Sequence, residues 1–124
     1  MQVLIVDDSA DAAASLTMLL ELEDIVAQSV GDAEAALQFV AHTVPLLLLI
    51  DIGLPGMNGY ELARRLRELP HLTGATLIAL TGREGPSQQE QALFNQFWTK
   101  PFDPRRLIEE VKGVIRRAAD RSPA

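Results

Sequence analysis

The hydrophobic positions of this chain fall into short continuous runs, separated by stretches with helical spacing. Two runs, VLIV at residues 3–6 and LLLLI at residues 46–50, lack polar alternation, so we expect strands that are covered on both faces. Further strands are predicted at residues 75–80, at residues 25–30 with partial alternation, and at residues 96–98. The pattern therefore predicts five strands.

Four segments between and after the strands carry apolar residues at helical spacing, and three of them have a predicted cap. The segments are residues 9–22, 32–41, 58–69 and 104–118, and Ser9, Asp32 and Asp103 are the predicted caps. Pro104 takes the first helical position of the last segment. The third segment spaces its charges for helical ion pairs at Glu61, Arg64, Arg65 and Glu68, and we expect its arginines to form a solvated face.

Strands and helices alternate along the chain. This order predicts an α/β fold with a doubly wound parallel sheet, right-handed crossovers and helices on both faces. Ligands of such sheets bind at the carboxyl ends of the strands. The residues at those ends are therefore the first place to look for function.

Composition narrows the class of protein. The 124 residues suit one domain, and the balance of 48% apolar to 23% charged residues is that of a globular protein. The absence of cysteine excludes disulfides, thiolate zinc sites and a cysteine nucleophile. A net charge of −6 disfavours direct binding to nucleic acid or to an anionic membrane. The apolar start has no basic residues before it, so we expect a cytoplasmic protein with no membrane association.

Polar residues follow four of the predicted strands directly. They are Asp7 and Asp8 after the first strand, Asp51 after the third, Thr81 after the fourth and Lys100 after the fifth. Taken singly, each has an ordinary explanation as a helix cap, a turn residue or a solvated lysine. Because all five fall at one edge of the predicted sheet, the sequence predicts a shared site there.

The chemistry of such a site follows from its charges. Three gathered carboxylates repel one another unless a cation intervenes, and Mg²⁺ is the simplest hard cation with oxygen ligands. An aspartate can also attack a phosphoryl group and form an acyl phosphate. The compact ammonium of Lys100 suits the new phosphoryl charge, and the hydroxyl of Thr81 can donate a hydrogen bond to it. The residues therefore indicate phosphoryl transfer to a carboxylate.

These motifs resemble the receiver domain of two-component response regulators. The matching stretches are LIVDDS, LLLLIDIGLPGMNGYELARRLR, IALTG and FWTKPF, and the resemblance covers about residues 2–117. It implies a flavodoxin-like fold with strand order 2-1-3-4-5 and a receiver domain at residues 1–118. The chain end at residues 119–124 is expected to be a disordered tail.

The resemblance also implies roles for individual residues. Asp51 is the phosphoacceptor, and Thr81 and Lys100 contact the phosphoryl group. Asp8, Asp51 and the carbonyl of Gly53 ligate Mg²⁺, with Asp7 acting partly through water. Thr81 and Phe97 form the conformational switch, and a cis peptide bond precedes Pro101.

The implied function is that of a phosphorylatable signalling switch in a phosphorelay. A sensor histidine kinase or phosphotransfer protein donates the phosphoryl group to Asp51, and the switched conformation controls a downstream partner that the resemblance does not name. We expect no enzymatic activity beyond the phosphorylation and dephosphorylation of the chain itself. The alternatives are a protein-interaction module with a receiver fold, or a Mg²⁺-dependent phosphohydrolase with an aspartyl nucleophile. The hydrolase lacks support because the position two residues after Asp51 is Gly53 and not an acid.

The segment between Thr81 and Lys100 departs from the family. It is shorter than usual by about one helical turn, which predicts a short helix at residues 87–94, and Leu93 and Phe94 replace the usual small pair. In the family this region belongs to the output surface. Arg83 stands two residues after Thr81, where we expect it to cover the aspartyl phosphate and slow its hydrolysis.

Overall fold

A five-stranded parallel sheet of order β2-β1-β3-β4-β5 lies at the centre of the computed structural model, which describes residues 2–82 and 88–121. In chain order the elements are β1 (Val3–Val6), α1 (Ala10–Leu22), β2 (Ala27–Val30), α2 (Ala33–Val40), β3 (Leu47–Asp51), α3 (Gly59–Arg67), the 3-10 helix η1 (Pro70–Leu72), β4 (Thr76–Thr81), α4 (Gln88–Gln91), β5 (Gln96–Thr99) and α5 (Pro104–Arg121). The predicted fold class and strand order are confirmed.

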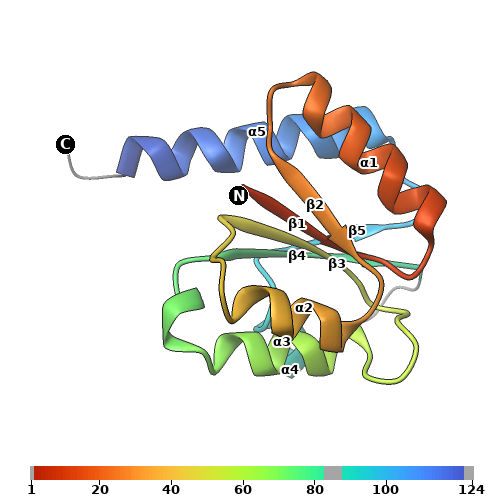
Figure 1. Cartoon of the computed structure of the whole chain (residues 1–124), viewed down its shortest axis with the longest axis vertical. Coiled ribbons are helices and arrows are strands. Elements are labelled where there is room, and N and C mark those ends of the chain that lie inside the picture. The colour runs from red at the N-terminus through yellow and green to blue at the C-terminus, as the bar shows by residue number, and fades with distance from the viewer. Residues whose placement is uncertain (1, 83–87, 122–124) are drawn as a thin grey trace.

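Helices cover both faces of the sheet, with α1 and α5 on one side and α2, α3 and α4 on the other (Figure 1). Alternate strand residues point to opposite faces. Val3 and Ile5 therefore pack into the core layer under α1 and α5, whereas Leu4 and Val6 pack under α2 and α3. Because both layers are apolar, the central strands read as unbroken hydrophobic runs, as the sequence pattern predicted.

The predicted caps Ser9, Asp32 and Asp103 begin their helices, and Asn58, which was not predicted as a cap, begins α3 in the same way. In each case a side-chain oxygen accepts a hydrogen bond from a backbone N–H in the first helical turn. These bonds run from Ala12 N–H to Ser9 (3.3 Å), from Ala35 N–H to Asp32 (2.7 Å), from Glu61 N–H to Asn58 (3.0 Å) and from Arg105 N–H to Asp103 (2.9 Å). The polar residues between the strands thus fix where each crossover helix starts.

Several element boundaries differ from the prediction. Strands β3 and β4 include Asp51 and Thr81 themselves, because the ladder continues through Asp51 paired with Leu80 and Thr81 paired with Thr99. Helix α5 continues to Arg121 and does not end at residue 118.

The helix predicted at residues 87–94 is shorter in the structure. Helix α4 covers only Gln88–Gln91, and none of the four residues described in it is buried. The residue that anchors this segment is Phe94, which follows α4 and is 7% exposed. Position 87 and Arg83 lie outside the described residues, so the predicted role of Arg83 is not addressed by the structure.

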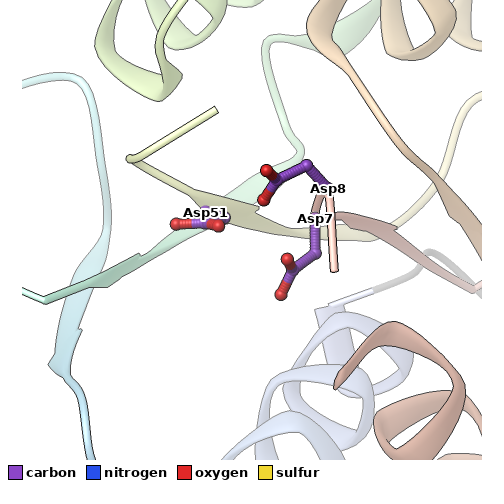
Figure 2. Close-up of side chains that lie close together, drawn as sticks. All are labelled: Asp7, Asp8 and Asp51. Atoms are coloured by element: carbon purple, nitrogen blue, oxygen red, sulfur yellow. The ribbon is translucent and has the colours of Figure 1, made fainter. Parts of the chain in front are cut away.

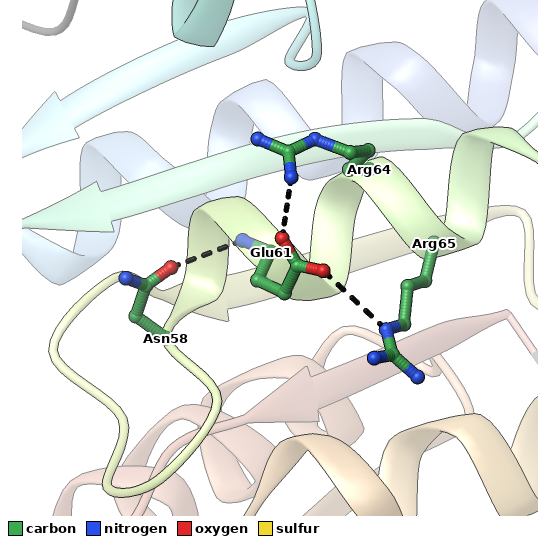
Figure 3. Close-up of polar contacts among 4 residues, drawn as sticks. All are labelled: Asn58, Glu61, Arg64 and Arg65. Carbon is green, nitrogen blue, oxygen red and sulfur yellow. Dashed lines mark hydrogen bonds and ion pairs between the residues drawn. The ribbon is translucent and has the colours of Figure 1, made fainter.

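The expected solvated face of α3 is confirmed for two of its arginines. Glu61 forms ion pairs with the exposed Arg64 at 2.6 Å and Arg65 at 3.5 Å (Figure 3). For Arg67 the expectation was wrong. Its half-buried guanidinium donates hydrogen bonds to three separate segments: the Leu93 carbonyl after α4 (3.0 Å), the Ala75 carbonyl before β4 (3.0 Å) and Oδ1 of Asn95 before β5 (2.8 Å).

Among residues 2–82 and 88–121, no helix combines the length and the apolar character that crossing a bilayer requires.

Candidate functional site

The strand register brings the predicted residues to one edge of the sheet. Val6 pairs with Ile50, so Asp7 and Asp51 are lateral neighbours just beyond that pair. Thr81 pairs with Thr99 at the end of the ladder between β4 and β5. The backbone N–H of the next residue, Lys100, donates to the Thr81 carbonyl at 2.7 Å. The carboxyl ends of four strands therefore meet where the sequence predicted a shared site.

Three carboxylates form a single cluster of oxygen atoms at this edge (Figure 2). One side-chain oxygen from each of Asp7, Asp8 and Asp51 lies within 4.8 Å of the other two. Asp7 and Asp51 are buried, at 4% and 7% exposure, whereas Asp8 is exposed. Solvent therefore reaches the cluster from the side of Asp8, while the other two carboxylates are shielded from it.

Backbone N–H groups orient the two buried carboxylates. The N–H of Ser9 donates to Oδ1 of Asp7 at 2.9 Å, and the N–H of Gly53 donates to Oδ1 of Asp51 at 3.0 Å. Each bond spans two residues and closes a tight turn directly after the strand. The carboxylate positions are therefore set by the turns that follow β1 and β3.

Gly59 lets the loop after β3 close against the site. Its N–H donates to the Ile52 carbonyl at 3.1 Å as α3 begins. A Cβ at this position would lie 2.7 Å from both the carbonyl oxygen of Asp51 and Cα of Ile52, distances that packed atoms do not adopt. Only a residue without a side chain allows this close approach of the α3 N-terminus to the end of β3.

Lys100 faces Asp51. Its Nζ lies 3.5 Å from Oδ1 of Asp51, and its side chain is 38% exposed. The peptide bond between Lys100 and Pro101 is cis, as the resemblance implied. One ammonium therefore stands against a cluster of three carboxylates.

Burial, together with neighbouring carboxylates, raises the pKa of Asp7 above its ordinary value. Burial of the carboxylate is the largest cause, and the nearby charges of Asp51 and Asp8 act in the same direction. The Ser9 N–H and the Lys100 ammonium oppose the shift without cancelling it. The site is thus short of positive charge, which is the condition that a bound cation relieves.

The donor atoms fit a hard divalent cation. All three side chains of the cluster offer carboxylate oxygens, which are the ligands that Mg²⁺ and Ca²⁺ prefer over softer metals. Mg²⁺ takes one or two protein carboxylates and keeps several waters. The partly exposed cluster suits that habit better than an enclosed cage would.

The predicted switch residues lie on neighbouring strands. Thr81 is buried at the end of β4, at 5% exposure. Phe97 on β5 pairs with Ala79, two residues before Thr81, so these side chains share the face covered by α3 and α4. The two residues of the predicted switch, Thr81 and Phe97, therefore lie on adjacent strands and on the same face of the sheet.

An aromatic chain extends from Phe97 to α3, and the sequence analysis missed it. The Phe97 ring lies 5.3 Å from that of Phe94, and Phe94 lies 6.1 Å from Tyr60, with both pairs edge to face. The replacement of the usual small residue by Phe94 was the signal in the sequence. Its partner could not be read from the sequence, because Tyr60 is far away along the chain.

Comparison with known proteins agrees with this geometry. The family model of the response regulator receiver domain matches residues 3–112. An uncharacterised 14.6 kDa protein from the sodA1 3′ region of Leptolyngbya boryana is 37% identical over 115 residues, covering 90% of this chain and 88% of its own. The DNA-binding response regulator MtrA of Mycobacterium tuberculosis is 34% identical over 122 residues, covering 96% of this chain and 52% of its own.

Solved structures agree as well. The CheY-like receiver domain protein of Methanospirillum hungatei superposes with a TM-score of 0.85 at 27% identity, covering 98% of both chains. The receiver domain of a signal transduction histidine kinase from Syntrophus aciditrophicus gives 0.85 at 29% identity, covering 99% of this chain and 95% of its own. The chain spans about half the length of MtrA and of the haem response regulator HssR of Staphylococcus epidermidis. From this extent of sequence match, together with the strand order and the acidic edge, the chain belongs to the receiver domain family of two-component response regulators.

Proposed function

We propose that this chain is a phosphorylatable switch in which Asp51 accepts a phosphoryl group from a phosphohistidine. The donor would be a sensor histidine kinase or a phosphotransfer protein. The observation that carries the proposal is the 3.5 Å separation between Nζ of Lys100 and Oδ1 of Asp51, beside the carboxylates of Asp7 and Asp8. The ammonium of Lys100 is thus close enough to Asp51 to stabilise the negative charge of a phosphoryl group on that carboxylate.

Asp7, Asp8, Asp51 and the carbonyl of Gly53 are the groups that would hold Mg²⁺. The bound ion would supply positive charge that offsets the repulsion between the carboxylates and an incoming phosphoryl group. The raised pKa of Asp7, caused first by burial and then by its acidic neighbours, supports the need for that charge.

The residues of the chain do the remaining work of the transfer. A carboxylate oxygen of Asp51 forms the new bond to phosphorus, while the bond between phosphorus and the histidine nitrogen of the donor breaks. Lys100 stabilises the negative charge of the phosphoryl oxygens, and the Thr81 hydroxyl donates a hydrogen bond to one of them. Because Asp51 and Thr81 are buried, these electrostatic contacts act in a site of low dielectric constant.

The new charge would bias a two-state equilibrium. Movement of the Thr81 side chain toward the phosphoryl group leaves room on the face that it shares with Ala79. The ring of Phe97, opposite Ala79 on β5, can turn into that room. The α4–β5 side of the domain then presents a different surface to a downstream partner.

Labelling with acetyl phosphate and Mg²⁺ tests the proposal. Intact-mass measurement should show one added phosphoryl group on the wild type and none on Asp51→Asn. Turnover of an added phosphoester many times per chain would instead indicate a phosphohydrolase. Absence of labelling in the wild type would leave the protein-interaction module as the function.

The cation site has its own test. Mg²⁺ should raise the melting temperature of the wild type, because a ligand that binds only the folded state stabilises it. Asp8→Ala should remove most of that rise, since it deletes one oxygen donor of the cluster. Asp11→Ala is the matched control, because Asp11 is an exposed acid in the first turn of α1 and outside the cluster. Equal loss in both variants would contradict the assignment.

A further inference from the structure

A pocket of about 320 Å³ opens beside the acidic site, between α1 and the connection from β5 to α5. Pockets that hold small molecules begin at roughly this volume. Its apolar walls come from leucines of α1 and β4 and from the segment that follows Lys100; the residues are Leu16, Leu19, Leu80, Pro101, Phe102 and Pro104. The pocket is therefore an apolar space joined to a charged site.

Two residues belong to both the pocket and the site. Asp7 and Lys100 line the pocket, and Nζ of Lys100 is also 3.5 Å from Oδ1 of Asp51. In Figure 2 the carboxylate of Asp7 points toward the side of the sheet on which α1 and α5 lie. A molecule whose charged head meets Lys100 at the site thus has the pocket directly beside it for its remaining atoms.

We infer that this pocket receives the apolar body of a small-molecule acyl phosphate, whose phosphoryl group is transferred to Asp51. This inference rests on the proposed function and adds the class of small donor that the site prefers. The phosphoryl head is an anion that fits Lys100, and the body meets leucine, proline and phenylalanine side chains. An acyl group of three to five carbons or a benzoyl group uses the pocket, whereas an acetyl group leaves it nearly empty.

The transfer is balanced without a further reactant. An Asp51 carboxylate oxygen forms a bond to phosphorus, and the bond between phosphorus and the acyl oxygen breaks. The electron pair of that bond leaves with the acyl group, which departs as a carboxylate anion.

The expected preference follows from burial of apolar surface. Each methylene group transferred from water into an apolar pocket favours the bound state by about fourfold. The two methylenes that distinguish butyryl from acetyl phosphate then favour the butyryl donor by roughly tenfold in its rate of Asp51 phosphorylation at subsaturating concentration. Because the two donors also differ in intrinsic reactivity, the ratio of their rates must be compared between variants.

A substitution that fills the pocket provides the comparison. Ser15 is exposed and lines the pocket from α1, so Ser15→Trp places a large ring there. Ala14→Trp is the matched control, because Ala14 is exposed on the same helix and is outside the set that lines the pocket. Ala12→Phe fills the pocket from a second exposed position on α1 and guards against misfolding of the first variant.

Binding gives a readout separate from transfer. Trp98 is the only tryptophan of the chain, and its ring lies 6.1 Å from that of Phe102, which lines the pocket. Titration with pentylphosphonate and with methylphosphonate, neither of which transfers its phosphorus group, can therefore be followed by Trp98 fluorescence in the presence of Mg²⁺. Because the two phosphonates differ by four methylenes, the longer one should bind the wild type more tightly by on the order of a hundredfold.

The measurement is the rate of Asp51 phosphorylation by butyryl and acetyl phosphate in each variant. We expect the butyryl-to-acetyl ratio to fall about tenfold in Ser15→Trp and Ala12→Phe and to stay unchanged in Ala14→Trp. An unchanged ratio in both filling variants overturns the inference. The inference is also overturned if the filling variants lose transfer from a phosphohistidine protein while the butyryl-to-acetyl ratio stays unchanged. The pocket would then serve a protein donor. Failure of the proposed function is distinguishable, since acetyl phosphate would then label no variant.

Discussion

The ammonium nitrogen of Lys100 lies 3.5 Å from Oδ1 of Asp51, although the two residues come from opposite halves of the chain. The contact exists because β3 and β5 both flank β4 and end at the same edge of the sheet. Asp51 is buried and Lys100 is partly exposed, so the pair is a half-buried cation facing an acidic cluster. Under the proposed function, this contact should influence both the binding of a cation and the acceptance of a phosphoryl group.

Replacing Lys100 should affect these two properties in opposite directions. Lys100→Gln removes a positive charge that repels Mg²⁺, so Mg²⁺ should bind roughly threefold to tenfold more tightly, as followed by Trp98 fluorescence. The same change removes the group that stabilises the phosphoryl charge, so labelling by acetyl phosphate should slow by about a hundredfold. The matched control is Lys112→Gln, because Lys112 pairs with Glu23 and Glu109 away from the site. Similar results for both lysines would contradict the assignment.

Asp7 should cost the folded protein stability at neutral pH when Mg²⁺ is absent. Burial and neighbouring acids raise its pKa above the ordinary 3.8, so the folded protein binds this proton more tightly than the unfolded chain does. The stabilisation that comes from this tighter proton binding is fully present below the ordinary pKa. It is lost as the pH rises through the pKa of Asp7 in the folded protein. Asp7→Asn should remove that pH dependence and raise the free energy of unfolding near pH 7 by on the order of 1 kcal/mol.

Urea unfolding across this pH range measures the effect. Asp11→Asn serves as the control, because Asp11 is exposed and outside the cluster, and it should leave the profile unchanged. A destabilised Asp7→Asn at neutral pH would show that the Asp7 carboxylate is held by favourable contacts and not crowded by its neighbours.

Gly59→Ala should destabilise the domain even though alanine favours helices. The intrinsic gain on replacing glycine in a helix is up to about 1 kcal/mol. The added Cβ, however, would lie 2.7 Å from the Asp51 carbonyl and from Cα of Ile52, which are backbone atoms that cannot move aside cheaply. We expect a net loss of about 1–2 kcal/mol in the free energy of unfolding. Gly74→Ala is the control, because a Cβ there meets no atom within 4 Å and the change should be nearly neutral.

Arg67 should contribute far more to stability than its neighbours on α3. Its guanidinium donates to Leu93, Ala75 and Asn95, and the same Asn95 oxygen accepts the N–H of Leu77 at 2.8 Å. Arg67→Ala removes three hydrogen bonds that join α3 to these segments and should cost about 3 kcal/mol of unfolding free energy.

Controls on the same helix separate this effect from simple loss of charge. Arg65→Ala removes an exposed ion pair and should change the free energy of unfolding by less than about 1 kcal/mol. Arg67→Lys should not restore stability, because an ammonium cannot reach three acceptors in the planar arrangement of a guanidinium. Equal losses for Arg65→Ala and Arg67→Ala would contradict the special role of Arg67.

The periodic part of the fold was predictable from the sequence. Ser9, Asp32 and Asp103 marked helix starts because a cap is a local interaction between a side chain and the next turn. Asp7, Asp51 and Lys100 could be assigned to one site because parallel strands carry their carboxyl ends to the same edge. Thr81 could be included for the same reason.

Contacts between segments far apart in the sequence were less predictable. Arg67 was expected to be solvated, because helical spacing places it near Arg64 and Arg65 and does not show that α4 and β5 pass over it. Helix α4 is shorter than the predicted helix at residues 87–94. The reason is that Phe94 is held by tertiary packing on Tyr60 and Phe97 and not by helical structure. Local patterns carried no information on either contact.

The most direct test of the account is to locate the phosphoryl group itself. The protein is incubated with Mg²⁺ and acetyl phosphate, and borohydride then reduces the aspartyl phosphate to homoserine, which peptide mass spectrometry identifies. The account predicts one modified residue, Asp51, with Asp7 and Asp8 unmodified and no modification in Asp51→Asn. Homoserine at any other aspartate, or an unmodified Asp51 in a labelled protein, would contradict it.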